Sequence, residues 1–255
     1  MSVSEEMPVR RFKLTIAYDG TAYAGWQVQL NETSVQQTIE TALAGIVNHP
    51  VKIHGSGRTD QGVHARGQVA HADLKCRMSP ESVGRALNAR LPQDIRILKV
   101  VSARSDFHAR RSAVGKEYRY FVWNDAMMLP DRRLYTTHVY RPLDVASLRE
   151  AAQRFVGRHD FASFTANPQR EVATTVRTLF AFTVSKRGKE IVFRVSGEGF
   201  LYKMVRSMVG FLIRVGEGAE KPEAVTELLE TCEPRKARVP SAPAQGLFLW
   251  RVWYR

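Results

Sequence analysis

Hydrophobic and polar positions alternate over residues 12–18 of the chain. A period of two is typical of a strand that buries one face. Apolar residues then recur every three or four positions over residues 35–46, which predicts an amphipathic helix. Ser34 directly precedes this helix and Gln37 follows three residues later, the pattern of a capping box. The chain therefore begins with a predicted strand and helix.

The same kinds of pattern continue to the end of the chain. We expect strands near residues 51–54, 67–73 and 95–97, with a second helix that begins at Ser79-Pro80. From about residue 113 the order recurs, with predicted strands at 118–123, 176–185, 190–196 and 247–252 and helices at 145–155 and 200–215. The sequence thus predicts an α+β protein of two halves with the order βαββαβ, residues 1–108 and residues 109–255.

Composition adds a basic surface to this picture. Lys and Arg number 38 against 25 Asp and Glu over 255 residues, which gives a formal charge of +13. Most of these cations are arginine, whose planar guanidinium can donate two parallel hydrogen bonds to a phosphate. The charge favours a polyanionic partner such as a nucleic acid. A solvated arginine-rich surface without such a partner is the alternative.

Cysteine usage and hydropathy bear on the setting. The two cysteines, Cys76 and Cys232, exclude a cysteine-rich secreted scaffold and a four-cysteine zinc site. A reducing, cytoplasmic setting is expected. The longest apolar stretch, near residues 211–215, is far shorter than the roughly 18 residues of a membrane-spanning helix, so we expect no membrane association. Residues 1–6 carry acids where a signal peptide carries bases, and we expect a short unstructured tail there.

The densest candidate for chemistry is the glycine-rich segment at residues 54–65. It contains Arg58 and Asp60 between glycines that allow a close approach to a ligand. A neighbouring arginine favours the charged form of a carboxyl group, so Asp60 could act as a nucleophile or a base. The alternative is a tight connection in which Asp60 only caps backbone amides. The segment lacks the Gly-Lys-Ser/Thr ending of a Walker phosphate loop.

A metal site is a second interpretation of the same region. Imidazole and carboxylate groups bind zinc or manganese, and His54, His64, His71 and Asp73 lie close in sequence. No HExxH or Cys-x-x-Cys motif accompanies them. Ordinary hydrogen-bonded histidines are the preferred interpretation.

Two later segments carry further candidates. Residues 107–120 interleave basic and aromatic side chains, as surfaces that bind single-stranded RNA do. Tyr118 and Tyr120 share one face of the predicted strand there, and burial in the core is the alternative for both. In the long helix, Arg206 borders the apolar stripe, so it is expected to be half-buried and to need a carboxylate partner. A surface arginine that snorkels is its alternative.

Taken together, these segments resemble the tRNA pseudouridine synthase A family over nearly the whole chain, from about Arg11 to Tyr254. Gly57-Arg58-Thr59-Asp60-Gln61-Gly62-Val63-His64-Ala65 is the most specific piece. The other pieces, in chain order, are Tyr18-Asp19-Gly20-Thr21, Gly25-Trp26-Gln27, Asn88-Ala89-Arg90-Leu91-Pro92, Phe107-His108-Ala109-Arg110, Lys116-Glu117-Tyr118-Arg119-Tyr120, His159-Asp160-Phe161, Gly199-Phe200-Leu201, Met204-Val205-Arg206, Ala242-Pro243 and Gly246-Leu247.

The resemblance implies both a fold and an activity. The fold would be two RRM-like halves with mixed or antiparallel sheets flanked by helices and an active cleft between the halves. The activity would be the isomerisation of uridine to pseudouridine at positions 38, 39 and 40 in the anticodon stem-loop of tRNA, without a cofactor or a required metal. The family works as a homodimer.

The resemblance also implies roles for individual residues. Asp60 would be the catalytic aspartate, and Arg206 would pair with it. Tyr118 would stack on the target base and take part in proton transfer. The remaining substrate contacts would come from Arg58, Arg110, Lys116 and Leu247.

Two other function classes compete with this interpretation. One is a non-catalytic RNA-binding protein of two RRM-like halves, which would leave the Asp60 loop without a purpose because a carboxylate repels phosphates. The other is a metal-dependent nuclease or phosphodiesterase built around the four metal-ligand candidates. Turnover separates the first from an isomerase, and sensitivity to a chelator separates the second.

Overall fold

The computed structural model describes residues 7–166, 174–232 and 238–255 of the chain. Residues 1–6, which the sequence predicts to be an unstructured tail, lie outside these ranges. The chain divides into two units. Unit 1 comprises Met1–Val114 together with Arg251–Arg255, and unit 2 comprises Gly115–Trp250.

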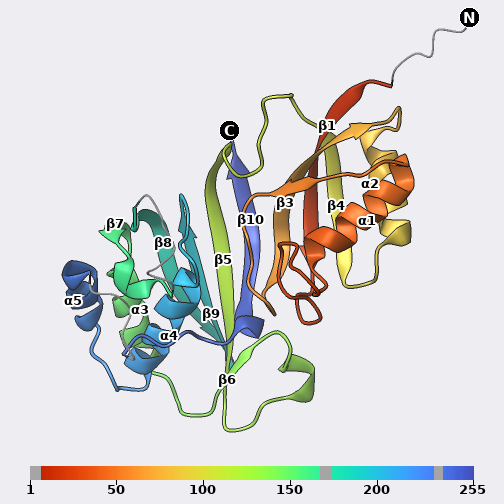
Figure 1. The fold of residues 1–255 in the computed structure, drawn as a ribbon. Coiled ribbons are helices and arrows are strands. Elements are labelled where there is room, and N and C mark those ends of the chain that lie inside the picture. The colour runs from red at the N-terminus through yellow and green to blue at the C-terminus, as the bar shows by residue number, and fades with distance from the viewer. Residues whose placement is uncertain (1–6, 167–173, 233–237) are drawn as a thin grey trace, which may run out of the picture. The chain divides into compact units, whose positions relative to one another are not determined.

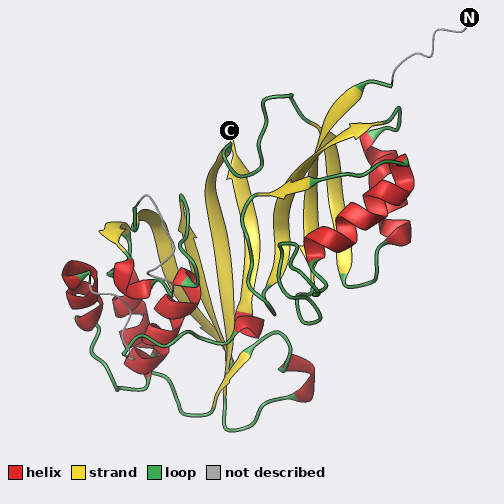
Figure 2. Ribbon diagram, in the orientation of Figure 1, coloured by secondary structure: helices red, strands yellow, loops and turns green. Residues whose placement is uncertain are grey.

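Unit 1 has the predicted order βαββαβ. Its elements are β1 (Val9–Tyr18), α1 (Val35–Val47), β2 (Ile53–Gly55), β3 (His64–Lys75), α2 (Pro80–Arg90) and β4 (Ile95–Ser102), and Figure 1 labels all of them except β2. Strand β1 lies between β4 and β3, and β2 pairs with β3; all of these pairings are antiparallel. The helices α1 and α2 lie beside this sheet (Figure 2).

Side-chain patterns explain these elements. On β1 the alternating Phe12, Leu14 and Ile16 are fully buried, which confirms the predicted period of two. Helix α1 begins where the Ser34 hydroxyl accepts a hydrogen bond from the Gln37 amide at 3.2 Å. Helix α2 begins with Pro80 at its first position, where a missing amide proton costs nothing.

Unit 2 repeats this order and adds short strands and a helix. Its elements are β5 (Ala113–Asn124), β6 (Thr137–Val139), α3 (Val145–Gln153), β7 (Gly157–Asp160), β8 (Val176–Arg187), β9 (Glu190–Gly197), α4 (Met204–Gly216), α5 (Ala224–Thr231) and β10 (Leu247–Tyr254), with 3₁₀ turns at Pro130–Arg132, Ala162–Phe164 and Ala244–Gly246. The residues of β5 before Gly115 and those of β10 after Trp250 belong to unit 1. The strand order is β10-β5-β9-β8-β7, and β6 pairs in parallel with β5. The α+β fold class is thus confirmed.

The start of α4 differs from the prediction. The helix was expected from residue 200 but begins at Met204, because Lys203 has a left-handed backbone with φ of 56°, which no α-helix contains. Leu201 precedes the helix and is buried. It therefore continues the apolar spacing of the helix although it is not helical itself. Strands β6 and β7, of three and four residues, were not predicted. No helix in the described ranges is long and apolar enough to cross a membrane.

Candidate active site

The loop that carries Asp60 connects β2 to β3 and is fixed at its first residues by a buried glutamine. The Ser56 amide donates to the Val69 carbonyl at 2.7 Å. The Gln68 side chain accepts from the Ser56 hydroxyl at 2.7 Å and donates to the Gly57 carbonyl at 2.9 Å. Ser56 and Gln68 are both fully buried, so these bonds are shielded from water. The first turn of the loop is therefore held to β3.

The residue directly before Asp60 is held just as firmly. Thr59 is buried, and its hydroxyl lies 2.8 Å from the Tyr18 hydroxyl at the end of β1. Its carbonyl accepts a hydrogen bond from the Trp26 amide at 3.1 Å. The Asp60 carbonyl in turn accepts from the Val63 amide at 3.1 Å, which closes a tight turn. Asp60, itself half-buried, is thus presented by a backbone with little freedom.

Two glycines explain why the segment after β1 lies so close to this loop. Gly25 has φ of 97°, and a Cβ there would come within 2.5 Å of the Thr59 carbonyl oxygen. A Cβ on Gly20 would overlap the Val63 carbonyl oxygen. Only glycine permits both contacts. The pieces at residues 18–21 and 25–27 therefore support the Asp60 loop from outside it.

His64, at the end of the loop, has a structural partner. Its Nδ1 accepts a hydrogen bond from the Gly20 amide at 3.0 Å, and an Asp19 carboxylate oxygen lies 3.1 Å away. The ring is fully buried. His64 thus joins the start of β3 to the turn after β1.

The other metal-ligand candidates also have structural partners. The Asp73 carboxylate binds the Arg11 guanidinium through two bonds of 2.7 and 2.6 Å, and Arg11 keeps the pKa of Asp73 below its usual value. His71 Nδ1 accepts from the Ala109 amide at 3.2 Å, and its ring stacks on that of His54 at 5.0 Å. Among the described residues, no three His, Cys, Asp or Glu side chains form a group that could hold a metal ion.

The segment after β4 places Arg110 in unit 1. The Ala109 carbonyl accepts a hydrogen bond from the Tyr254 hydroxyl at 2.7 Å, while its amide donates to His71. The Lys13 ammonium lies over the Tyr254 ring, 4.1 Å from its centre. Arg110 is exposed beside this anchored residue, and Arg58 is exposed on the Asp60 loop.

In unit 2, strand β5 places Tyr118. Tyr118 pairs in register with Val195 of β9, and its ring meets the Phe200 ring edge to face at 5.0 Å. The side chain is buried, and Lys116, two residues earlier, shares its face of the strand. Phe200 lies between the end of β9 at Gly197 and the start of α4 at Met204, so a non-helical segment contacts the tyrosine.

Arg206 lies in the first turn of α4 and is half-buried. Its Nε donates to the Ala242 carbonyl at 2.8 Å, and the Ala242 amide donates to the Arg206 carbonyl at 2.9 Å. The Nε bond restrains the plane of the guanidinium, and the backbone bond holds Ala242 against α4. Leu247, buried at the start of β10, lies five residues beyond Ala242.

The structure thus assigns the predicted residues to the two units. Those in unit 1 are Arg58, Asp60 and Arg110; those in unit 2 are Lys116, Tyr118, Arg206 and Leu247. Residue type and spacing did not predict three positions that support the candidate residues: Gln68 beside the Asp60 loop, Phe200 beside Tyr118 and Ala242 beside Arg206. Phe200 and Ala242 stand in pieces that the family resemblance contains, so a signal was present, but their contacts were not visible in it.

Comparison with known proteins identifies the family of the chain. The family described as tRNA pseudouridine synthase matches residues 14–110 and 151–255. The chain belongs to this family and is therefore an isomerase that acts on uridine in tRNA.

Individual proteins that are similar to this chain over nearly its whole length carry the name tRNA pseudouridine synthase A. The tRNA pseudouridine synthase A of Exiguobacterium sibiricum is 44% identical over 246 residues, which cover 96% of this chain and 97% of that protein. A protein of the same name from a second Exiguobacterium strain is 46% identical, with 96% and 98% covered. A solved archaeal box H/ACA sRNP Nop10–Cbf5 complex matches at 15% identity over 79% of this chain and 44% of that chain. The TM-score of this match is 0.36.

Proposed function

We propose that the chain isomerises uridine to pseudouridine at positions 38, 39 and 40 in the anticodon stem-loop of tRNA, in the cytoplasm, with no cofactor and no required metal. The observation that carries the proposal is the restrained loop around Asp60. The Thr59 hydroxyl makes a buried hydrogen bond with the Tyr18 hydroxyl, and the Gly57 carbonyl accepts one from the Gln68 side chain. A carboxylate presented by so rigid a backbone suits a reaction that needs it in one place.

The reaction requires a closed and well-ordered site. The bond between ribose C1′ and uracil N1 breaks, the uracil turns, and a bond forms between C1′ and C5. C5 loses a proton and N1 gains one, so atoms and electrons balance without an oxidant or a co-substrate. The base must not escape while it is detached, which requires the nucleotide to be flipped out of its stack into a pocket.

We assign the central step to Asp60. Its carboxylate attacks the ribose or the base, or it removes a sugar proton; both routes need the ionised form. In the proposal Arg206 pairs with Asp60, and Arg58 lies two residues away on the same loop. Positive charge beside a carboxyl group favours its ionised form.

Tyr118 and the remaining residues would hold the substrate. The Tyr118 ring stacks on the target base, and its hydroxyl serves in proton transfer. Arg58, Arg110 and Lys116 contact the backbone of the stem-loop, and Leu247 contributes an apolar wall. The charge of +13 supports an RNA substrate.

We further propose that the enzyme is a homodimer in which one tRNA contacts both subunits. The support is the family resemblance. Light scattering at micromolar concentration tests it: a mass of twice 28.9 kDa is expected, and a monomer that is fully active contradicts it.

Position-specific labelling tests the proposed substrate. Tritium at uridine C5 leaves the RNA when the C5–C1′ bond forms, so release reports turnover. One tRNA carries label only at positions 38–40 and a second carries it at every other uridine. We expect release from the first alone. Release from the second alone contradicts the site, and binding without release from either indicates a non-catalytic RNA-binding protein.

A further inference from the structure

A segment after α5, residues 238–243, runs along α4 in unit 2 and contacts it repeatedly. We call this segment the strap. It begins at Arg238 and ends at Pro243, next to the 3₁₀ turn Ala244–Gly246. Val239 and Ala242 are buried, so the strap packs into the interior of the unit.

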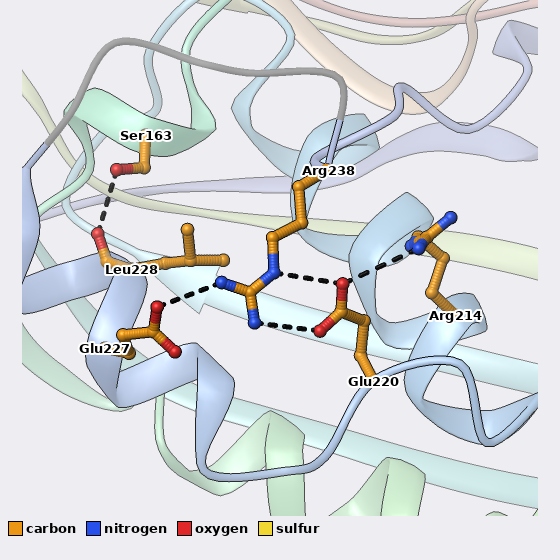
Figure 3. Close-up of polar contacts among 6 residues, drawn as sticks. All are labelled: Ser163, Arg214, Glu220, Glu227, Leu228 and Arg238. Carbon is orange, nitrogen blue, oxygen red and sulfur yellow. Dashed lines mark hydrogen bonds and ion pairs between the residues drawn. The ribbon is translucent and has the colours of Figure 1, made fainter.

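The strap begins at an ion-pair cluster, which Figure 3 shows. The Arg238 guanidinium donates to both carboxylate oxygens of Glu220, at 3.0 and 2.9 Å, and also to Glu227 of α5 at 3.0 Å. Arg214, in the last turn of α4, lies 3.6 Å from Glu220. The bond to Arg238 keeps the pKa of Glu220 below its usual value. Because Glu220 is mostly buried, this two-pronged bond fixes where the strap starts.

The middle of the strap lies directly on the helix backbone. A Cβ at Gly210 would overlap the Pro240 carbonyl oxygen, so only glycine lets the strap pass here. One turn earlier, the Ser207 and Ser241 hydroxyls lie 3.5 Å apart. The strap therefore follows α4 back toward its N-terminus, where Arg206 lies.

The far end of the strap meets Arg206. The Ala242 carbonyl accepts a hydrogen bond from the Arg206 Nε–H, and the Ala242 amide donates one to the Arg206 carbonyl. The next carbonyl, that of Pro243, accepts from the buried Tyr120 hydroxyl at 2.7 Å. The guanidinium plane of Arg206 is thus restrained by the Ala242 carbonyl. This carbonyl lies between two backbone groups that are themselves hydrogen-bonded, the Ala242 amide and the Pro243 carbonyl.

We propose that the strap is a positioning device for Arg206, with Arg238 as its anchoring residue. The ion pair of Arg238 with Glu220 holds the strap in register on α4, and the Ala242 carbonyl then orients the guanidinium that acts on the carboxylate or the substrate. This inference rests on the proposed function for the role of Arg206. The coupling of Arg238 to Arg206 is measured independently of turnover, by the exchange of the Arg206 Nε–H.

Two variants disturb the strap in different ways. Arg238→Met keeps the aliphatic stem and removes the ion pair, whereas Gly210→Ala pushes the strap outward without changing any charge. Matched controls exist for each. Arg154→Met removes an arginine paired with Glu150 and Glu223 outside the strap. Gly84→Ala adds a methyl group to α2, where the nearest atom would lie at 3.3 Å.

The first readout is independent of activity. The Nε–H of Arg206 gives a nitrogen–proton NMR signal, assigned by its loss in Arg206→Lys. Its exchange with solvent is slowed while it is bonded to Ala242. We expect faster exchange in Arg238→Met and Gly210→Ala and no change in the two controls.

The second readout is the single-turnover rate at saturating tRNA, well below the melting temperature. Misplacement of a catalytic group by about 1 Å can cost up to roughly 100-fold in rate, and we expect a loss of about tenfold with unchanged tRNA affinity. Unchanged exchange, or faster exchange with an unchanged rate, overturns the proposal, whatever happens to the melting temperature. If wild type releases no tritium, the proposed function fails, and the exchange rates still decide whether Arg238 holds Arg206.

Discussion

At the scale of single residues, the proposed catalytic groups depend on uncharged neighbours. The Tyr18 hydroxyl is fully buried against Thr59, and this burial raises the pKa of Tyr18 well above its ordinary value. Tyr18 therefore stays neutral at physiological pH. It supports the loop as a hydrogen-bonding group and contributes no charge beside Asp60.

Tyr118→Phe separates two roles of the tyrosine. The ring and its contact with Phe200 are retained, and the hydroxyl is lost. A positioned proton-transfer group contributes roughly 100- to 10,000-fold to the rate. We expect a loss in this range in single-turnover tritium release, with tRNA affinity unchanged. Turnover at the wild-type rate would exclude the hydroxyl from proton transfer.

His71 makes stability depend on pH. Burial lowers the pKa of His71 to about 4, and the nearby His108, Arg11 and His54 act in the same direction against a smaller opposite effect of Asp73. Between the ordinary pKa of about 6.5 and 4, the unfolded chain binds the proton and the folded chain does not. The free energy of unfolding therefore falls as the pH falls through this window.

His71→Gln should reduce that slope, because about one proton fewer is taken up on unfolding. Urea titrations at several pH values between 4 and 6.5 measure it. Wild type, titrated in parallel at each pH, is the reference. Equal slopes for wild type and His71→Gln would contradict the role of burial.

At the scale of elements, the Asp60 loop is supported by a neighbouring segment more than by its own residues. Gly25→Ala tests this. A left-handed backbone costs an L-residue roughly 1–2 kcal/mol, and the new Cβ would also press on the Thr59 carbonyl. We expect destabilisation together with at least a tenfold loss of turnover, because Asp60 is displaced.

Gly188→Ala is the matched control for this prediction. Gly188, in the turn between β8 and β9, also has a positive φ, of 58°, but a Cβ there would meet nothing within 4 Å. It should cost stability and leave the turnover of the folded enzyme unchanged. Equal turnover of the two variants would show that the contact between Gly25 and Thr59 does not position Asp60.

The same scale shows what the sequence could and could not predict. The alternation of Phe12, Leu14 and Ile16 and the Ser34 cap are local signals, and both were confirmed. The start of α4 was wrong because the apolar spacing continues through Leu201 although Lys203 has left the helical conformation. The spacing of apolar residues does not reveal the backbone conformation of a single residue.

The site shows a similar division. The motif singled out Asp60 as a candidate, a carboxylate beside an arginine and among glycines, and its catalytic role stays a prediction. The role of Ala242 could not be predicted, because it acts through a backbone carbonyl that is 36 positions from Arg206 in sequence. Such a contact depends on the tertiary path of the chain and leaves no trace in side-chain type.

At the scale of the whole molecule, the net charge of +13 predicts a strong salt dependence of tRNA binding. Each phosphate neutralised by an arginine releases condensed counterions, so the logarithm of the affinity falls linearly with the logarithm of salt concentration. Arg110→Gln should lower this slope by about 1. Arg187→Gln, at the exposed last residue of β8, should not. A flat dependence in wild type would contradict docking through arginines.

The most direct test of the account is tritium release by Asp60→Asn. The amide keeps the shape of the side chain and removes its charge and basicity, so it can neither attack nor take a proton. Asp106→Asn, at an exposed aspartate of unit 1 paired with Arg104, is the control. We predict no detectable release by Asp60→Asn, tRNA affinity near that of wild type, and full release by Asp106→Asn, all in the presence of a chelator. Release by Asp60→Asn at the wild-type rate would contradict the account.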